Sequence, residues 1–203
     1  MRRTANGRGV QGRLREKLPE LLLEAGSVVF AVLLALGVDE WRERRNQEAL
    51  AERARASILE EIRANREELR GTQAANRALF QKIEAALPRL AEDPGARLEE
   101  GSDVQFAITY QLALLSSAAW QTAQMTQAAH FMDYDQVTRI SRVYDQQALY
   151  LNSQSGIVEL ISSMAELEQD DPHRMFTIIA HRLRINLDLQ EALLAEYEGI
   201  LEG

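Results

Sequence analysis

The sequence predicts an all-α protein in which an N-terminal transmembrane helix continues into a charged stalk and then into an antiparallel four-helix bundle. Three observations predict this fold. They are an apolar run near the N-terminus, a composition rich in strong helix formers, and apolar residues that recur every three or four positions along the remaining chain. No segment of useful length alternates as a strand does. The 203 residues include no Cys, which excludes disulfides and thiolate chemistry.

The apolar run covers residues 21–38 and contains one charged residue, Glu24. At a rise of about 1.5 Å per residue, this run would extend roughly 27 Å, close to the ~30 Å hydrocarbon core of a bilayer. Glu24 lies near the start of the run, where its carboxylate can reach the headgroups at a cost well below the midplane value. We therefore expect a transmembrane helix at residues 18–41.

The residues that follow the run suit the edge of a membrane. An indole prefers the interfacial layer, and long basic side chains can extend to the same level. The residues that we expect at the membrane interface are Trp41, Arg42, Arg44 and Arg45.

Two other interpretations of the apolar run stay open. One is a buried helix of a soluble protein, although residues 27–38 lack the polar face that an amphipathic helix would have. The other is a cleaved signal peptide, because Ala35 and Gly37 place small residues where a signal peptidase acts. Charged helical sequence continues without a break after the run, which favours an uncleaved signal anchor.

Charge is distributed unevenly along the chain. Residues 1–17 carry six basic residues and Glu16, a net charge of +5, so a total of −8 leaves −13 for the remainder. This acidic remainder argues against a nucleic-acid partner. Basic residues before the span outnumber those that follow closely, which favours a cytoplasmic N-terminus. We expect a single-pass protein of the bacterial inner membrane, with its body in the periplasm.

One face of the expected span carries small residues at a spacing of about four. Such a face lets two membrane helices approach closely, and a carboxylate lies on the same side. The expected self-association residues are Glu24, Ser27, Ala31 and Ala35. The lipid bilayer is therefore one expected partner, and a second copy of this chain or another membrane protein is the other.

The residues around the span also follow an ordered pattern: Glu24, then Ala35, Leu36, Val38, Asp39, Trp41, Glu43 and Arg45. In this pattern the chain resembles a family of uncharacterised single-pass bacterial membrane proteins, filed as a domain of unknown function. Ala31 stands where that family usually has Gly, which keeps a small residue at the position. The resemblance implies membrane anchorage and a helical body, and it implies no activity.

The chain divides into four expected parts: a basic cytoplasmic head at residues 1–17, the transmembrane helix at 18–41, a charged helical stalk at 42–57 and an extracytoplasmic bundle at 58–203. The first bundle helix continues to about residue 87, and Asn65, Thr72 and Asn76 fill gaps in its apolar stripe. Residues 88–103 contain two Pro and two Gly, which predict a break.

The other three bundle helices are predicted from their start signals. The second would begin at the N-cap Ser102 and end near Phe131, with a new helix able to begin at Ser116 and Ser117. The third would begin after Asp133 and end near residue 167. The fourth would begin at Asp171 and Pro172, an N-cap followed by Pro at the first helical position, and reach the C-terminus.

The sequence contains few candidates for catalytic or metal-binding residues. Three His residues lack the spacing of metal ligands, no catalytic motif is present, and we expect no cofactor. The small, polar and aromatic sequence around Trp120, Gln121 and Gln124 marks a candidate cavity in the bundle.

These observations favour a non-enzymatic, membrane-anchored interaction or scaffold protein that associates with itself. The alternative is an extracytoplasmic bundle that senses a ligand and signals through a partner protein. A membrane-tethered enzyme is a third hypothesis.

Overall fold

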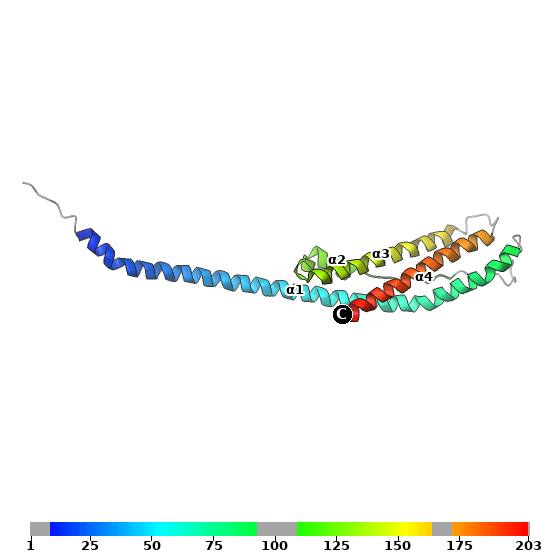
Figure 1. Ribbon diagram of the computed structural model, residues 1–203, viewed down its shortest axis with the longest axis horizontal. Coiled ribbons are helices and arrows are strands. Elements are labelled where there is room, and N and C mark those ends of the chain that lie inside the picture. Colours follow the sequence, from blue (N-terminus) through cyan, green and yellow to red (C-terminus); the bar gives the residue numbers. More distant parts are fainter. Residues whose placement is uncertain (1–8, 93–108, 164–171, 203) are drawn as a thin grey trace, which may run out of the picture. The chain divides into compact units, whose positions relative to one another are not determined.

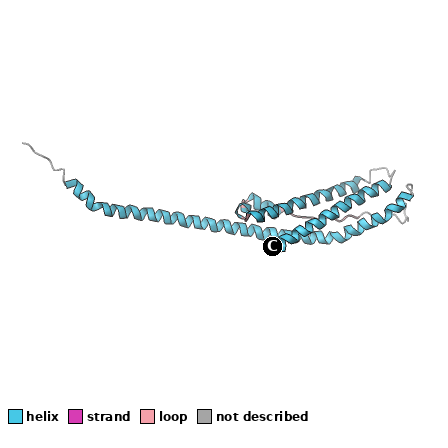
Figure 2. Cartoon of the chain, in the orientation of Figure 1, coloured by secondary structure: helices cyan, strands magenta, loops and turns pink. Residues whose placement is uncertain are grey.

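A computed structural model describes residues 9–92, 109–163 and 172–202 of the chain (Figure 1). Within the first of these ranges, it describes the side chain of Leu23 and those from Gly26 onward. The helices are α1 at Gly9–Glu92, α2 at Ala118–Met125, the 3₁₀ helix η1 at Ala128–Phe131, α3 at Tyr134–Ser163 and α4 at Pro172–Glu202. The described residues contain no strand (Figure 2), so the expectation of an all-α protein is confirmed.

The chain forms two compact units, Met1–Ala49 and Leu50–Gly203. In the first unit, all side chains that are described up to residue 46 are exposed, including the large apolar ones between Leu23 and Trp41. No helix among the described residues is long and apolar enough to cross a membrane. The transmembrane part of the expected fold is therefore not confirmed.

Ion pairs and hydrogen bonds give the directions of the long helices in the second unit. The ion pairs Arg70–Glu198, Arg77–Glu191 and Arg184–Glu84 join α1 to α4 at 2.6, 3.7 and 2.7 Å, and they show that these two helices run in opposite directions. Two hydrogen bonds join α1 to α3, one between Glu61 and Tyr144 and one between Asn65 and Gln147. The residue numbers of these contacts increase along α1 and along α3 together, so the two helices run in the same direction.

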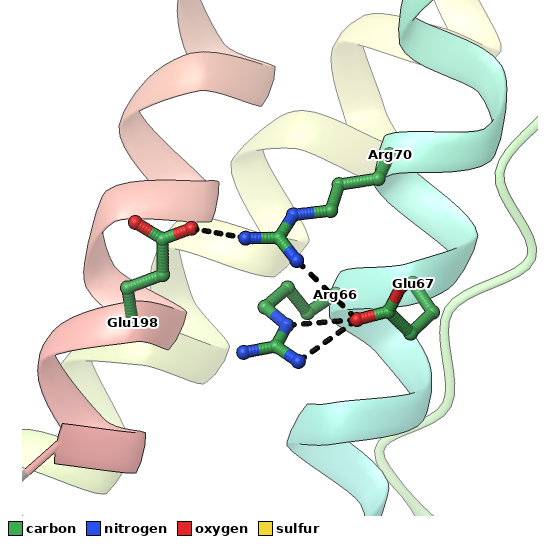
Figure 3. A network of polar contacts seen from close by, with 4 residues as sticks. All are labelled: Arg66, Glu67, Arg70 and Glu198. Atoms are coloured by element: carbon green, nitrogen blue, oxygen red, sulfur yellow. Dashed lines mark hydrogen bonds and ion pairs between the residues drawn. The ribbon is translucent and has the colours of Figure 1, made fainter.

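Figure 3 shows one of these junctions, where Arg70 of α1 contacts both Glu198 of α4 and Glu67 of its own helix. Arg66 also binds Glu67, with 2.8 Å between a guanidinium nitrogen and a carboxylate oxygen. Most of these side chains are well exposed to water, and such pairs contribute little to stability. The network therefore marks the register of α1 against α4 and does not explain why the helices associate.

Two hydrophobic clusters supply the main stabilisation of this unit through burial of apolar surface. The first joins α1 to α2, α3 and the C-terminal part of α4, and the second joins the far part of α1 to α3 and the N-terminal part of α4. Fully buried members of the first cluster include Ile58, Ile62, Leu69, Val143, Tyr150 and Tyr197. Those of the second are Ile83, Ile157, Ile179 and Leu183.

The expected second bundle helix is wrong over residues 109–117, which form no helix. Hydrogen bonds attach Gln111 to Asn76 and Ser116 to Asn65. Asn76 and Asn65 are roughly 16 Å apart along α1 at its helical rise, and residues 111–116 cover this length only in an extended conformation. The second unit thus consists of three long helices and an extended segment that runs antiparallel to α1, followed by the short α2.

The starts of α3 and α4 agree with the sequence, whereas α1 ends at Glu92 and not near residue 87. Asp133 caps α3, because its Oδ1 accepts hydrogen bonds from the N–H groups of Asp135 at 2.9 Å and Gln136 at 3.1 Å. Helix α4 begins at Pro172, as predicted. The expected start at Ser102, the expected end of α3 near residue 167 and the cap Asp171 lie outside the described residues. Helix α1 continues past Pro88 to Glu92, where burial of Leu90 in the second cluster favours continuation.

Candidate functional site

Polar side chains of α1 and α3 surround the extended segment at residues 110–117 and the first turn of α2, and they bind the backbone of both. We call this set the amide cradle. All but two of its members are buried, which is unusual for residues of these types. The members are Glu61, Asn65, Glu68, Asn76, Gln147 and Gln154.

Three of the amides each bind both backbone groups of one residue. Asn76 donates to the carbonyl of Gln111 at 2.8 Å and accepts its N–H at 2.8 Å. Gln154 does the same with Ala113, at 3.1 and 2.9 Å. Asn65 binds Ser116 likewise, at 2.7 and 2.9 Å. Each side-chain amide thus replaces the peptide group that a neighbouring strand would supply.

Gln147 connects the cradle to the third long helix. Its Nε2 donates to the carbonyl of Ser116 at 3.0 Å, and its Oε1 accepts from the Asn65 amide at 3.2 Å. The same Oε1 accepts the hydroxyl of Tyr197, on α4, at 2.7 Å. One buried amide therefore contacts the extended segment, α1 and α4 at once.

Glu61 of α1 lies beside the N-terminus of α2, and its carboxylate accepts several hydrogen bonds. The donors are the hydroxyl of Ser116 at 2.6 Å, the N–H of Ala119 at 3.0 Å and the hydroxyl of Tyr144 at 2.7 Å. Partial burial raises the pKa of the Glu61 carboxyl, but the hydrogen bonds lower it by more, so the pKa lies below its ordinary value. The carboxylate thus caps the N-terminus of α2 from outside that helix.

The expected cavity residues have three different environments. Trp120 is buried and stacks on Tyr144, with 5.9 Å between ring centroids and 8° between planes. Gln121 is exposed and donates to the Ser117 hydroxyl at 2.8 Å. Gln124 is exposed and lines a surface recess with Tyr134, among others. The structure does not bring these three side chains around one enclosed cavity.

The expected span residues lie in the first unit. Ser27, Ala31 and Ala35 are exposed there, whereas the side chain of Glu24 lies outside the described residues.

Of the expected interface residues, Trp41 is exposed and has the Arg45 guanidinium 5.3 Å from its ring centroid, within the range of a cation–π contact. Arg44 pairs with Glu40 at 3.1 Å, and Arg42 is exposed.

Metal ligands do not converge in the part of the chain that the structure describes, where no group of three His, Cys, Asp or Glu side chains could hold an ion. His130 instead contacts the ring of Phe131 edge to face. The chemistry that the site offers is recognition of an extended backbone by amides, with one carboxylate at a helix terminus.

Sequence reasoning missed the amide cradle, although one signal was present. Asn65, Thr72 and Asn76 interrupt the apolar stripe of α1, and a buried amide needs hydrogen-bond partners. The Thr72 hydroxyl donates a hydrogen bond to the Leu69 carbonyl of its own helix at 3.1 Å. The two Asn residues use a segment that is distant in sequence.

Comparison of this chain with protein-family models, with curated proteins and with solved structures finds no significant match. The resemblance of the N-terminal stretch to a family of membrane proteins stays an expectation.

We predict that Asn65→Leu lowers the free energy of unfolding by about 1–3 kcal/mol, because the buried Asn65 amide is lost and the partly buried N–H and carbonyl of Ser116 lose this partner. Chemical unfolding followed by circular dichroism measures this loss. Gln111→Ala is the matched control, since only the backbone of Gln111 binds the cradle, and it should change stability by less than about 0.5 kcal/mol. Equal effects from the two variants would contradict the cradle.

We also predict a pH-dependent contribution from Glu61. Because folding lowers its pKa, the stabilisation is complete above the ordinary pKa of a Glu, roughly 4.3, and is lost as pH falls through the lower folded pKa. Glu61→Gln should therefore be less stable than the parent at neutral pH, and the difference should shrink in acid. Thermal unfolding of both proteins across this pH range provides the comparison, and a difference that stays constant with pH would refute the assignment.

Proposed function

We propose that this chain is a non-enzymatic, single-pass membrane protein whose helical body serves as an interaction scaffold. In this proposal residues 18–41 anchor the chain in the bacterial inner membrane, residues 1–17 are cytoplasmic and the body lies in the periplasm. Residues 42–57 form the stalk that leads to the bundle.

The observation that carries this proposal is the exposure of apolar side chains on every side of α1 in the first unit. Leu23 is 76% exposed and Phe30 68%, and successive positions at 28–30 and 32–34 also present large exposed apolar groups. Exposing such apolar surface to water costs a free energy of roughly 25 cal/mol per Å². Lipid chains would cover all sides of this helix at once, which a single protein neighbour would not.

The length of the run supports the same proposal when the whole sequence is counted. Within the run, the structure describes the surroundings of Leu23 and then of every residue from Gly26 onward. Residues 26–38 alone are fewer than the roughly 20 residues that a span needs. The apolar sequence itself begins at residue 21. The proposed span therefore uses residues 21–38, with Trp41 and the arginines after it at the interface.

The amide cradle supports an interaction role over a catalytic one. Its amides bind the chain's own backbone, and Glu61 accepts three hydrogen bonds from the same fold. A general base or nucleophile would need a free approach to its reacting atom. The polar groups of this site are therefore structural in the proposal.

Membrane attachment is tested by fractionation with alkaline carbonate. The full-length chain should remain in the membrane pellet and enter solution only with detergent. Leu33→Arg with Leu34→Arg should release it, because each Arg costs about 2.5–3.5 kcal/mol at the centre of a span. Leu149→Arg, at an exposed position of α3, is the control and should not. Release of the unaltered chain by carbonate would disprove the anchor.

Self-association is tested on the small-residue face. Ala31→Leu with Ala35→Leu should abolish crosslinking between copies in membranes, because two added side chains keep the helices apart. Val29→Leu with Val32→Leu adds volume on other sides of the same helix and should leave crosslinking intact. If the first pair of substitutions has no effect, this face does not mediate association.

A further inference from the structure

The second unit has a surface recess among α2, η1 and the first turn of α3. Its volume is about 830 Å³. Sites that bind small molecules have volumes of roughly 300–1,000 Å³, so the recess is large enough for one. The residues that line it are Gln124, Gln127, Ala129, His130, Met132, Tyr134 and Val137. All of them belong to one compact unit, and none belongs to the amide cradle.

The lining of the recess divides into an apolar floor and a polar rim. Ala129, Met132 and Val137 are partly buried and pack against the first hydrophobic cluster, so they form the floor. The other lining residues are exposed and form the rim: Gln124, Gln127, His130 and Tyr134. A molecule in the recess would therefore contact apolar groups on one side and polar groups around its edge, which is the usual composition of a small-molecule site.

The polar groups of the rim are not used by the fold. Their side chains form no hydrogen bond with other described residues, whereas the amides of Asn65 and Asn76 in the cradle are fully engaged with backbone. A Gln carboxamide both donates and accepts hydrogen bonds, and so do a Tyr hydroxyl and a neutral imidazole. The rim can therefore offer donors and acceptors to a ligand without breaking a contact of the protein.

Gln127 lies at the rim in an unfavourable backbone conformation. Its φ of 60° and ψ of 12° are in the left-handed region, and among the described residues it is the one non-glycine residue with positive φ. Glycine adopts this conformation without steric cost, whereas the Cβ of any other residue makes it unfavourable. Strain of this kind is concentrated at ligand-binding sites. The position thus carries a side chain that lines the recess where a glycine would suit the backbone better.

The charges in and around the recess favour a neutral ligand. The lining contains no Lys or Arg that could pair with an anion and no Asp or Glu that could pair with a cation. Asp133 and Asp135 adjoin Tyr134 in sequence, and their negative charge disfavours an anion further. The Asp133 carboxylate is already engaged, because it accepts the N–H groups of Asp135 and Gln136.

We propose that this recess binds a neutral saccharide. A sugar ring has faces of C–H groups, which suit the floor and the Tyr134 ring, and hydroxyls at its edge. Each hydroxyl donates and accepts, as the carboxamides of Gln124 and Gln127 do. This inference goes beyond the scaffold role, and it does not require residues 18–41 to cross a membrane, because every residue that carries it lies in the second unit.

The test is titration calorimetry on the full-length chain in a zwitterionic detergent, since a detergent with a sugar headgroup would compete. The probes are four neutral disaccharides, namely cellobiose, maltose, lactose and diacetylchitobiose. Choline serves as a cationic comparison and inorganic phosphate as an anionic one. We expect at least one disaccharide to bind more tightly than choline and phosphate. Binding of none of the four, or preferential binding of choline or phosphate, would overturn the proposal.

Three variants then locate the binding in the recess. Gln127→Gly and Tyr134→Ala should each raise the Kd of the bound disaccharide roughly tenfold, because each removes a hydrogen-bonding group from the rim. Leu149→Ala, at an exposed position of α3 that does not line the recess, should leave the Kd unchanged.

Gln127→Gly also separates a binding role from a structural one. Since glycine relieves the strain at this position, the variant should unfold at the same temperature as the parent or a higher one while it loses affinity. Unchanged affinity in both Gln127→Gly and Tyr134→Ala would show that the sugar binds elsewhere and would overturn the assignment. None of these results bears on the carbonate fractionation, which tests the membrane anchor separately.

Discussion

The second unit depends on how the backbone of an extended segment finds hydrogen bonds inside a helical protein. Among the described residues no strand lies beside residues 111–116, and a peptide group that is buried without a partner, as that of Ala113 would be, costs as much as a lost hydrogen bond. Amides from α1 and α3 supply donors and acceptors at distances of 2.7–3.1 Å. These bonds require the two helices to lie at one fixed register on either side of the segment.

Other features of the unit follow from this arrangement. Gln147 also fixes the position of α4, because its Oε1 accepts the hydroxyl of Tyr197. The two hydrophobic clusters form where the aligned helices face one another. The segment ends where Glu61 caps α2, and this contact holds the N-terminus of α2 against α1. A polar constraint thus determines the geometry, and apolar burial supplies most of the stabilisation.

The sequence predicted those elements whose signals are local. The cap at Asp133 and the Pro at position 172 mark helix starts through contacts within a few residues, so α3 and α4 begin where expected. The stripe of Ile58, Ile62 and Leu69 identified the core face of α1 in the same way. Local patterns of this kind were sufficient for the all-α class.

Residues 109–117 were misassigned because their conformation depends on distant partners. Their apolar residues are compatible with a helix, and nothing nearby reveals that Asn65 and Gln154 bind their backbone. The partners are 41 and 51 positions away, so only the presence of unexplained amides on buried stripes signals them. The cradle therefore could be suspected from sequence but not located.

Hydrogen exchange at single backbone amides tests the cradle most directly. We predict that the N–H groups of Gln111, Ala113 and Ser116 exchange as slowly as buried amides of α1, because each donates to a side-chain oxygen within 2.9 Å. Exchange of all three at the rate of an unstructured peptide, while α1 stays protected, would contradict this account of the fold.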